Sequence, residues 1–235
     1  MFDSLPAQQS DLDAVANWEQ VYRSNLKPSL WGSTAVPFMR HIARRYCRPD
    51  SQVLVLPCGE GRNTLPLLEY CDELVAADAS PSALRIASAR LGASQQRNWR
   101  TVLCEAGESG FAADQFDLTL CWDLLGHLRD PARVVSELLR VTRPGGLVIG
   151  SLISTECSTR GLDMDATDDG AFLYDGRYYF RFYDRAAAHA LLVRSGAELL
   201  ELDRVAWVDP PHDGYRPYPH LHVSWSFILR KPGRR

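Results

Sequence analysis

Short apolar runs alternate with amphipathic stretches through the middle of the chain, and this alternation limits the fold more than any other feature. The first run, residues 53–56, is Val-Leu-Val-Leu, which is typical of a strand buried on both faces. Four more apolar runs follow at 74–77, 101–104, 116–122 and 147–153. Strands joined by helices or helix-length connections form βαβ units. The pattern therefore predicts an α/β fold with a mainly parallel sheet and helices on both faces.

The two ends of the chain are less regular. Residues 1–17 carry no basic residue and few large apolar ones, so we expect a loose arm there. Residues 154–182 show no clear period. After a helix at about 184–195, two further strand-like runs cover 199–208 and 222–229. The sequence shows no internal repeat and no linker, which indicates a single domain over residues 1–235.

Composition excludes several functional classes. The chain has 26 Lys plus Arg against 29 Asp plus Glu. This balance argues against a nucleic-acid partner, because phosphate backbones need a basic face. No apolar run approaches the ~20 residues that cross a bilayer, and the N-terminus lacks the features of a secretory signal. The six cysteines form no C-x-x-C pair, so we expect a cytoplasmic, reducing location without a disulfide framework or a zinc site.

A glycine-containing turn follows the first strand and carries the strongest functional signal. It reads Cys58-Gly59-Glu60-Gly61, and Asn63 is the expected N-cap of a helix after it. Open parallel sheets bind ligands beyond the carboxyl ends of their strands. Asp78 ends the second strand and can accept both hydroxyls of a ribose, and Glu105 ends the third. Glycines and two acids at neighbouring strand ends predict a nucleoside-shaped ligand.

Two other kinds of protein remain open at this point. A nicotinamide-dependent oxidoreductase is disfavoured, because the third glycine of the fingerprint G-x-G-x-x-G would fall at Thr64. A non-catalytic nucleotide-binding protein of the same fold is the second alternative, since one scaffold hosts many activities.

Six segments, in this order, resemble class I S-adenosylmethionine-dependent methyltransferases. They are 53–61, 77–81, 104–106, 116–117, 127–131 and 143–146. Their order and spacing match the family from about residue 50 to 155. The resemblance implies a Rossmann-like, doubly wound sheet of seven mainly parallel strands with the last one antiparallel. It also implies S-adenosylmethionine as cofactor and S-adenosylhomocysteine as product. Residues 1–48 would form a helical cover, 49–153 the cofactor-binding half and 154–235 the acceptor-side half.

The same resemblance indicates a small-molecule branch of the family. Residues 54–59 are similar to thiopurine methyltransferases and residues 58–63 to tellurite-resistance methyltransferases. We therefore expect a small-molecule acceptor, methylated at S, N, O or a metalloid by in-line displacement, and a monomer or homodimer. Val55 and Pro57 depart from the family pattern, and Val55 removes an acid that often faces the ammonium end of the cofactor.

Individual roles also follow from the resemblance. Asp78 would hold the ribose, Glu105 and Ala106 would face the adenine, and aromatic residues near the N-terminus would close over the site. The full set of cofactor-binding residues is Trp18, Tyr22, Trp31, Cys58, Gly59, Gly61, Asn63, Asp78, Ala79, Glu105, Ala106, Cys121 and Trp122. His127 and Tyr179 are the catalytic candidates, although positioning alone can supply ~7–11 kcal/mol.

Two clusters allow more than one interpretation. The aromatic run 178–183 fits either an edge strand or a wall of the acceptor pocket. His212, His220 and His222 could suggest a metal centre, but prolines and tyrosines are interleaved with them. We expect a polar rim there and no metal.

Overall fold

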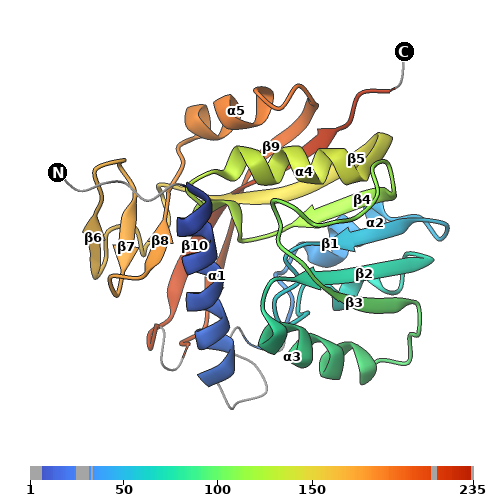
Figure 1. Cartoon of the computed structure of the whole chain (residues 1–235), viewed down its shortest axis with the longest axis horizontal. Helices are drawn as coiled ribbons and strands as arrows, with labels where there is room; N and C mark the ends of the chain where they lie inside the picture. The colour runs from blue at the N-terminus through green and yellow to red at the C-terminus, as the bar shows by residue number, and fades with distance from the viewer. Residues whose placement is uncertain (1–6, 25–31, 33, 213–215, 234–235) are drawn as a thin grey trace.

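A seven-stranded sheet forms the centre of the molecule (Figure 1). The computed structural model describes residues 7–24, 32, 34–212 and 216–233. The strand order is β3-β2-β1-β4-β5-β10-β9. Their bounds are β1 Gln52–Val55, β2 Glu73–Asp78, β3 Trp99–Leu103, β4 Phe116–Cys121, β5 Thr142–Ile153, β9 Glu198–Asp209 and β10 His220–Arg230. Strands β1 to β5 pair in parallel, and β10 runs antiparallel to both β5 and β9. The predicted Rossmann-like architecture is confirmed.

Helices cover both faces of this sheet, as the continuous apolar strands require. Val53 and Val55 pack in one core cluster with residues of α2 and α3, whereas Leu54 and Leu56 pack in a second cluster with α4 and α5. Successive side chains of a strand point to opposite faces, which explains the division. The helices are α1 Ala7–Ser24, α2 Met39–Tyr46, α3 Pro81–Gly92, α4 Pro131–Val141 and α5 Arg185–Val193, with short 3₁₀ turns η1 Leu65–Leu67 and η2 Leu125–His127. Of the helices described, none is long and apolar enough to cross a membrane.

Side-chain caps begin α3 and α4, whose first turns lie at the candidate site. The Ser80 hydroxyl accepts a hydrogen bond from the backbone N–H of Ala83 at 3.0 Å, with Pro81 in the first turn. Asp130 caps α4 in the same way through the N–H of Arg133 at 3.2 Å. Both starts agree with the preference for a polar cap followed by proline.

The predicted helix after Asn63 is wrong. Only the single 3₁₀ turn η1 forms there, and Asn63 does not cap it. Instead the Asn63 side-chain oxygen accepts a hydrogen bond from the backbone N–H of Val36 at 3.1 Å. The chain reaches β2 through further tight turns, which bury Leu67 and Leu68 in the core.

The loose arm predicted for residues 1–17 is also wrong where the structure describes it, because α1 begins at Ala7. Ala14, Trp18 and Tyr22 recur at a spacing of four residues and line the candidate site. Val21 packs with aromatic residues of β8. Figure 1 shows α1 between α3 and the sheet that contains β8, and α1 contacts both elements.

Residues 154–182, which we expected to be irregular, contain a small antiparallel sheet. Its strands are β6 Met164–Ala166, β7 Phe172–Tyr174 and β8 Tyr178–Phe180, in that order. Strands of three residues are too short for a period to be visible. The loop between β6 and β7 contains Asp168 and Asp169. The Asp169 carboxylate accepts hydrogen bonds from Tyr179 at 2.9 Å and from Arg181 at 2.8 Å.

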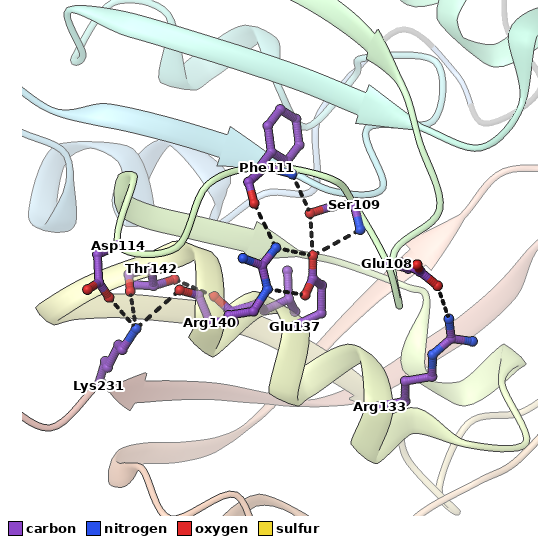
Figure 2. A network of polar contacts seen from close by, with 10 residues as sticks. Glu108, Ser109, Phe111, Asp114, Arg133, Glu137, Arg140, Thr142 and Lys231 are labelled. Atoms are coloured by element: carbon purple, nitrogen blue, oxygen red, sulfur yellow. Dashed lines mark hydrogen bonds and ion pairs between the residues drawn. The ribbon is translucent and has the colours of Figure 1, made fainter.

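A polar network holds the loop between β3 and β4 against α4 (Figure 2). The buried carboxylate of Glu137 accepts hydrogen bonds from the backbone N–H and the hydroxyl of Ser109 and from Arg140. Arg140 also donates to the carbonyl of Phe111 at 2.7 Å. Lys231 joins the network by donating to Asp114 at 2.6 Å. Since Glu105 lies at the start of this loop, the network fixes one wall of the candidate site.

We predict that Glu137→Gln destabilises the protein by about 1.5–3 kcal/mol at pH 7, because hydrogen bonds to a charged group are lost. The hydrogen bond from Arg140, together with those from Ser109, lowers the pKa of Glu137 to about 2. The carboxylate therefore stabilises the fold above its unfolded pKa of about 4.5, and this contribution is lost as the pH falls toward 2. Urea unfolding at pH 7 and pH 3 should show the difference between variant and wild type shrinking at pH 3.

Glu108→Gln is the matched control. Its ion pair with Arg133 belongs to the same loop, but the Glu108 side chain is 80% exposed, so little change is expected. A Glu137→Gln deficit of equal size at both pH values would contradict the electrostatic origin of the effect.

Candidate functional site

A cavity lies at the carboxyl ends of β1, β2 and β4, with α1 on one side. The glycine turn, the start of α3 and the loop after β3 line one part of it. The other part is lined by residues from the C-terminal half of the chain: Ile153, Thr159, Phe180, Asp209, Arg216, His220 and His222. The cavity therefore joins the predicted cofactor-binding half to the predicted acceptor-side half.

The two glycines of the turn have different uses. Gly59 has φ +51°, and a Cβ atom there would lie 3.2 Å from the Tyr22 hydroxyl, so glycine permits the close approach of α1. Gly61 has φ +79°, and a Cβ atom there would lie 3.3 Å from Ala87 of α3. Gly61 thus packs the turn against a helix, while Gly59 faces the cavity.

Asp78 connects the turn to the end of β2. Its carboxylate accepts hydrogen bonds from the backbone N–H of Gly59 at 2.8 Å and of Ser80 at 2.9 Å. Burial raises the pKa of Asp78 to about 6, although these N–H groups oppose the shift. A carboxylate can accept about four hydrogen bonds, so Asp78 keeps capacity for hydroxyl donors from the cavity.

Glu19 fixes α1 over this region. Its carboxylate accepts hydrogen bonds from the Ser80 hydroxyl at 2.6 Å and from the hydroxyl and N–H of Ser82 at 2.8 and 3.1 Å. Burial would raise the pKa of Glu19, but these bonds outweigh it and hold the pKa below its usual value. A carboxylate at the N-terminus of α3 also interacts favourably with the helix dipole.

His127 lies among aromatic rings in the wall of the cavity. Its ring centroid is 5.1 Å from that of Trp18 and 4.5 Å from that of Phe180. Nδ1 lies 3.1 Å from the carbonyl oxygen of Tyr179, which can only accept, so Nδ1 carries the proton in the neutral ring. Burial lowers the pKa of His127 to about 4, so the imidazole is neutral at pH 7.

Most of the predicted site residues line the cavity. They are Trp18, Tyr22, Cys58, Gly59, Asn63, Asp78, Ala79, Glu105, Ala106, Trp122 and His127. Among the described residues, Gly61, Cys121 and Tyr179 do not line it. Cys121 packs in the core cluster opposite Trp122, as strand alternation requires, and the Tyr179 hydroxyl points to Asp169. Trp31 lies outside the described residues. Phe180 lines the cavity from an edge strand, so both interpretations of the aromatic run hold for it.

The sequence reasoning missed several polar residues of the cavity. These are Glu60, Arg62, Asp123, Asp209 and Arg216. Asp123 could have been found, because it follows the end of β4 just as Asp78 ends β2. Glu60 and Arg62 could have been found as well, because they lie in the glycine turn or directly after it. Asp209 and Arg216 could not, since their place in the cavity depends on how distant segments meet.

Asp123 is a third acid at a strand end, after Asp78 and Glu105. It adopts φ +56°, and its N–H donates to the Ser151 hydroxyl at 2.9 Å. That hydroxyl in turn donates to the Asp123 carboxylate at 3.2 Å. Burial raises the pKa of Asp123 to about 7, and the nearby charge of Arg62 opposes the shift. A carboxylate with a raised pKa in the wall of a cavity is typical of a group that handles protons.

The chain is similar to known methyltransferases. Residues 54–150 match a family model described as a methyltransferase domain. A ubiquinone biosynthesis O-methyltransferase from Cereibacter sphaeroides is 25% identical over 182 residues, which cover 76% of this chain and 68% of that protein. An uncharacterized methyltransferase from Mycolicibacterium vanbaalenii is 30% identical over 129 residues, which cover 53% of this chain and 49% of that protein.

The fold is shared with solved structures. One is the 1,6-didemethyltoxoflavin-N1-methyltransferase of Burkholderia thailandensis, solved with 1,6-didemethyltoxoflavin and S-adenosylhomocysteine. It has a TM-score of 0.70 at 18% identity, covering 99% of this chain and 93% of that chain.

The chain carries a methyltransferase domain. The predicted enzyme class and cofactor are thereby confirmed, and the matches favour neither alternative, the nicotinamide-dependent oxidoreductase or the non-catalytic protein. They do not single out a thiopurine-like or tellurite-like branch.

We predict that the affinity of this methyltransferase for S-adenosylhomocysteine falls roughly tenfold between pH 7 and pH 5. If Asp78 holds the ribose, only its ionised form can accept from both hydroxyls, and its pKa is about 6. Asp78→Asn should weaken binding at pH 7 by about 1–3 kcal/mol and remove this pH dependence. Isothermal titration calorimetry at both pH values measures the effect.

Asp123→Asn is the control, because Asp123 lines the same cavity and also has a raised pKa. The control should retain the pH dependence that Asp78→Asn loses. If the two variants behave alike, Asp78 does not hold the ribose.

Proposed function

We propose that this methyltransferase moves a methyl group to a hydroxyl oxygen of a small molecule, with Asp123 as the general base. The observation that carries the proposal is the Asp123 carboxylate in the cavity wall, which the Ser151 hydroxyl orients by a hydrogen bond of 3.2 Å. The name of the Cereibacter sphaeroides relative, an O-methyltransferase, supports oxygen as the acceptor atom.

In the proposed arrangement, the cofactor occupies the half of the cavity nearest the glycine turn. Asp78 accepts the ribose hydroxyls, Glu105 and Ala106 face the adenine, and the backbone of Gly59 lines the methionine part. Trp18 and Tyr22 of α1 cover the cofactor, with Glu19 holding α1 in place. The acceptor occupies the half lined by Phe180 and the residues of β9 and β10.

The cofactor supplies an already activated methyl group, so the protein has two tasks. It aligns the acceptor oxygen with the methyl–sulfur bond and excludes water, which can be worth ~7–11 kcal/mol. It also removes the hydroxyl proton, because a neutral hydroxyl is a poor nucleophile. As the oxygen–carbon bond forms, the carbon–sulfur bond breaks, its electron pair stays on sulfur, and the proton passes to Asp123.

The other candidates fit a base less well. His127 has a pKa of about 4, so it holds a proton weakly and serves better as a neutral hydrogen-bond partner. Burial and a hydrogen bond to Asp169 raise the pKa of Tyr179 above its usual value, so its hydroxyl keeps its proton. That hydroxyl donates to Asp169 and points away from the cavity.

We predict that Asp123→Asn lowers kcat by about 10²- to 10⁴-fold, the usual contribution of a general base, while the affinity for S-adenosylhomocysteine stays unchanged. Asparagine is tolerated at positive φ, so the backbone should be retained. Asp163→Asn is the matched control, because Asp163 has φ +53° and is exposed on the surface.

Turnover is measured with labelled S-adenosylmethionine and a panel of phenols, catechols, thiols and heterocyclic amines. Transfer to hydroxyl acceptors that is lost in Asp123→Asn and kept in Asp163→Asn supports the proposal. Transfer restricted to thiols or amines, with no loss in Asp123→Asn, would contradict it.

A further inference from the structure

Two histidines and an aspartate meet where β9 and β10 approach the cavity. Asp209 ends β9, His220 begins β10, and the two residues are direct partners in the antiparallel pairing. His212 comes from the connection between these strands, and its ring centroid lies 5.5 Å from that of His220. One ligand atom from each of the three residues lies within 4.8 Å of the others. All three side chains are buried.

The hydrogen bonds around the cluster orient ligand atoms toward its centre. Nδ1 of His220 lies 3.3 Å from the carbonyl oxygen of Tyr218, which can only accept, so the proton of the neutral ring is on Nδ1. Nε2 then presents a lone pair toward Oδ2 of Asp209 at 4.0 Å. This separation is too long for a hydrogen bond, and two acceptor atoms facing each other would both be satisfied by a cation.

The second oxygen of Asp209 is held from outside the cluster. Arg62 Nη1 lies 3.5 Å from Oδ1, which leaves Oδ2 directed at His220. Metal-ligating histidines usually donate their other ring N–H to a carbonyl, and ligating carboxylates are themselves hydrogen-bonded. The carbonyl of Tyr218 and the guanidinium of Arg62 occupy these supporting positions.

We propose that Asp209, His212 and His220 bind a divalent first-row transition metal ion of the Zn²⁺ type. Imidazole nitrogen suits such ions, whereas Mg²⁺ prefers oxygen ligands throughout. Ligand atoms around a tetrahedral zinc ion lie about 3.4 Å apart, so the cluster needs to contract by roughly 1.4 Å at most. The nearby positive charges of Arg62 and Arg216 oppose a cation, and the carboxylates of Asp209 and Asp123 offset them.

The position of the cluster at the cavity wall would let a bound ion contact the acceptor. Asp209 and His220 line the cavity, so a three-residue site would leave a coordination position facing the acceptor. An ion there favours acceptors with an oxygen donor beside the reactive hydroxyl, such as catechols, and lowers the pKa of a coordinated hydroxyl. This use rests on the proposed function, whereas metal binding itself does not.

The test measures metal binding without cofactor or acceptor. The full chain is stripped with a chelator and titrated with Zn²⁺ in competition with a chromophoric zinc chelator. We expect one Zn²⁺ per chain, with no competition from excess Mg²⁺. His212→Ala and His220→Ala should weaken binding by roughly 100-fold or more. His189→Ala, which removes an exposed imidazole on α5, should bind as the wild type does.

A measurement on the wild type avoids dependence on how the variants fold. In histidine-labelled protein, Zn²⁺ should shift the NMR signals of His212 and His220 and leave those of the exposed His41 and His189 in place. Failure to bind Zn²⁺, or equal binding by His212→Ala, His220→Ala and wild type, would overturn the metal site. In either case the Asp123→Asn experiment can still be interpreted, because it measures turnover and not metal content.

Discussion

The site depends on one buried carboxylate. Asp78 accepts backbone N–H groups from the glycine turn after β1 and from the start of α3, and so joins two segments that border the cavity. Glu19 of α1 likewise accepts hydrogen bonds from Ser80 and Ser82, and so connects α1 to the start of α3. Burial destabilises the charged form of Asp78, which raises its pKa, and the hydrogen bonds from the N–H groups offset only part of this effect. Hydroxyl donors from a ribose would supply further compensation.

The proposed acceptor side is formed mainly by antiparallel strands. Its polar residues come from an antiparallel pair of strands, where the register places Asp209 opposite His220 and Trp207 opposite His222. The His222 ring stacks on Trp207 at 4.4 Å, so an aromatic platform lies beside the charged cluster. Asp123 reaches the same region from β4. Parallel strands therefore supply the proposed cofactor half, and the antiparallel end of the sheet supplies most of the proposed acceptor half.

The parallel sheet and the cofactor half could be predicted because their signals are local. Apolar runs define β1 to β5, and a strand end shows where Asp78 must lie. The predicted N-cap role of Asn63 is wrong, because its side chain accepts a hydrogen bond from the N–H of Val36, 27 residues earlier in the chain. The sequence predicts a polar rim at residues 212–222, because prolines and tyrosines are interleaved with the histidines. Only strand register brings Asp209 to His220, so the cluster proposed above has no local signal. Contacts between distant segments are the part that one sequence does not reveal.

The central claim is that the cavity at the carboxyl ends of β1, β2 and β4 holds the adenosyl group. A crystal structure of the complex with S-adenosylhomocysteine tests it most directly. We predict ribose hydroxyl oxygens within about 2.5–3.0 Å of the Asp78 carboxylate, with the sulfur toward Asp123. A ligand bound elsewhere, or a ribose turned away from Asp78, would contradict it.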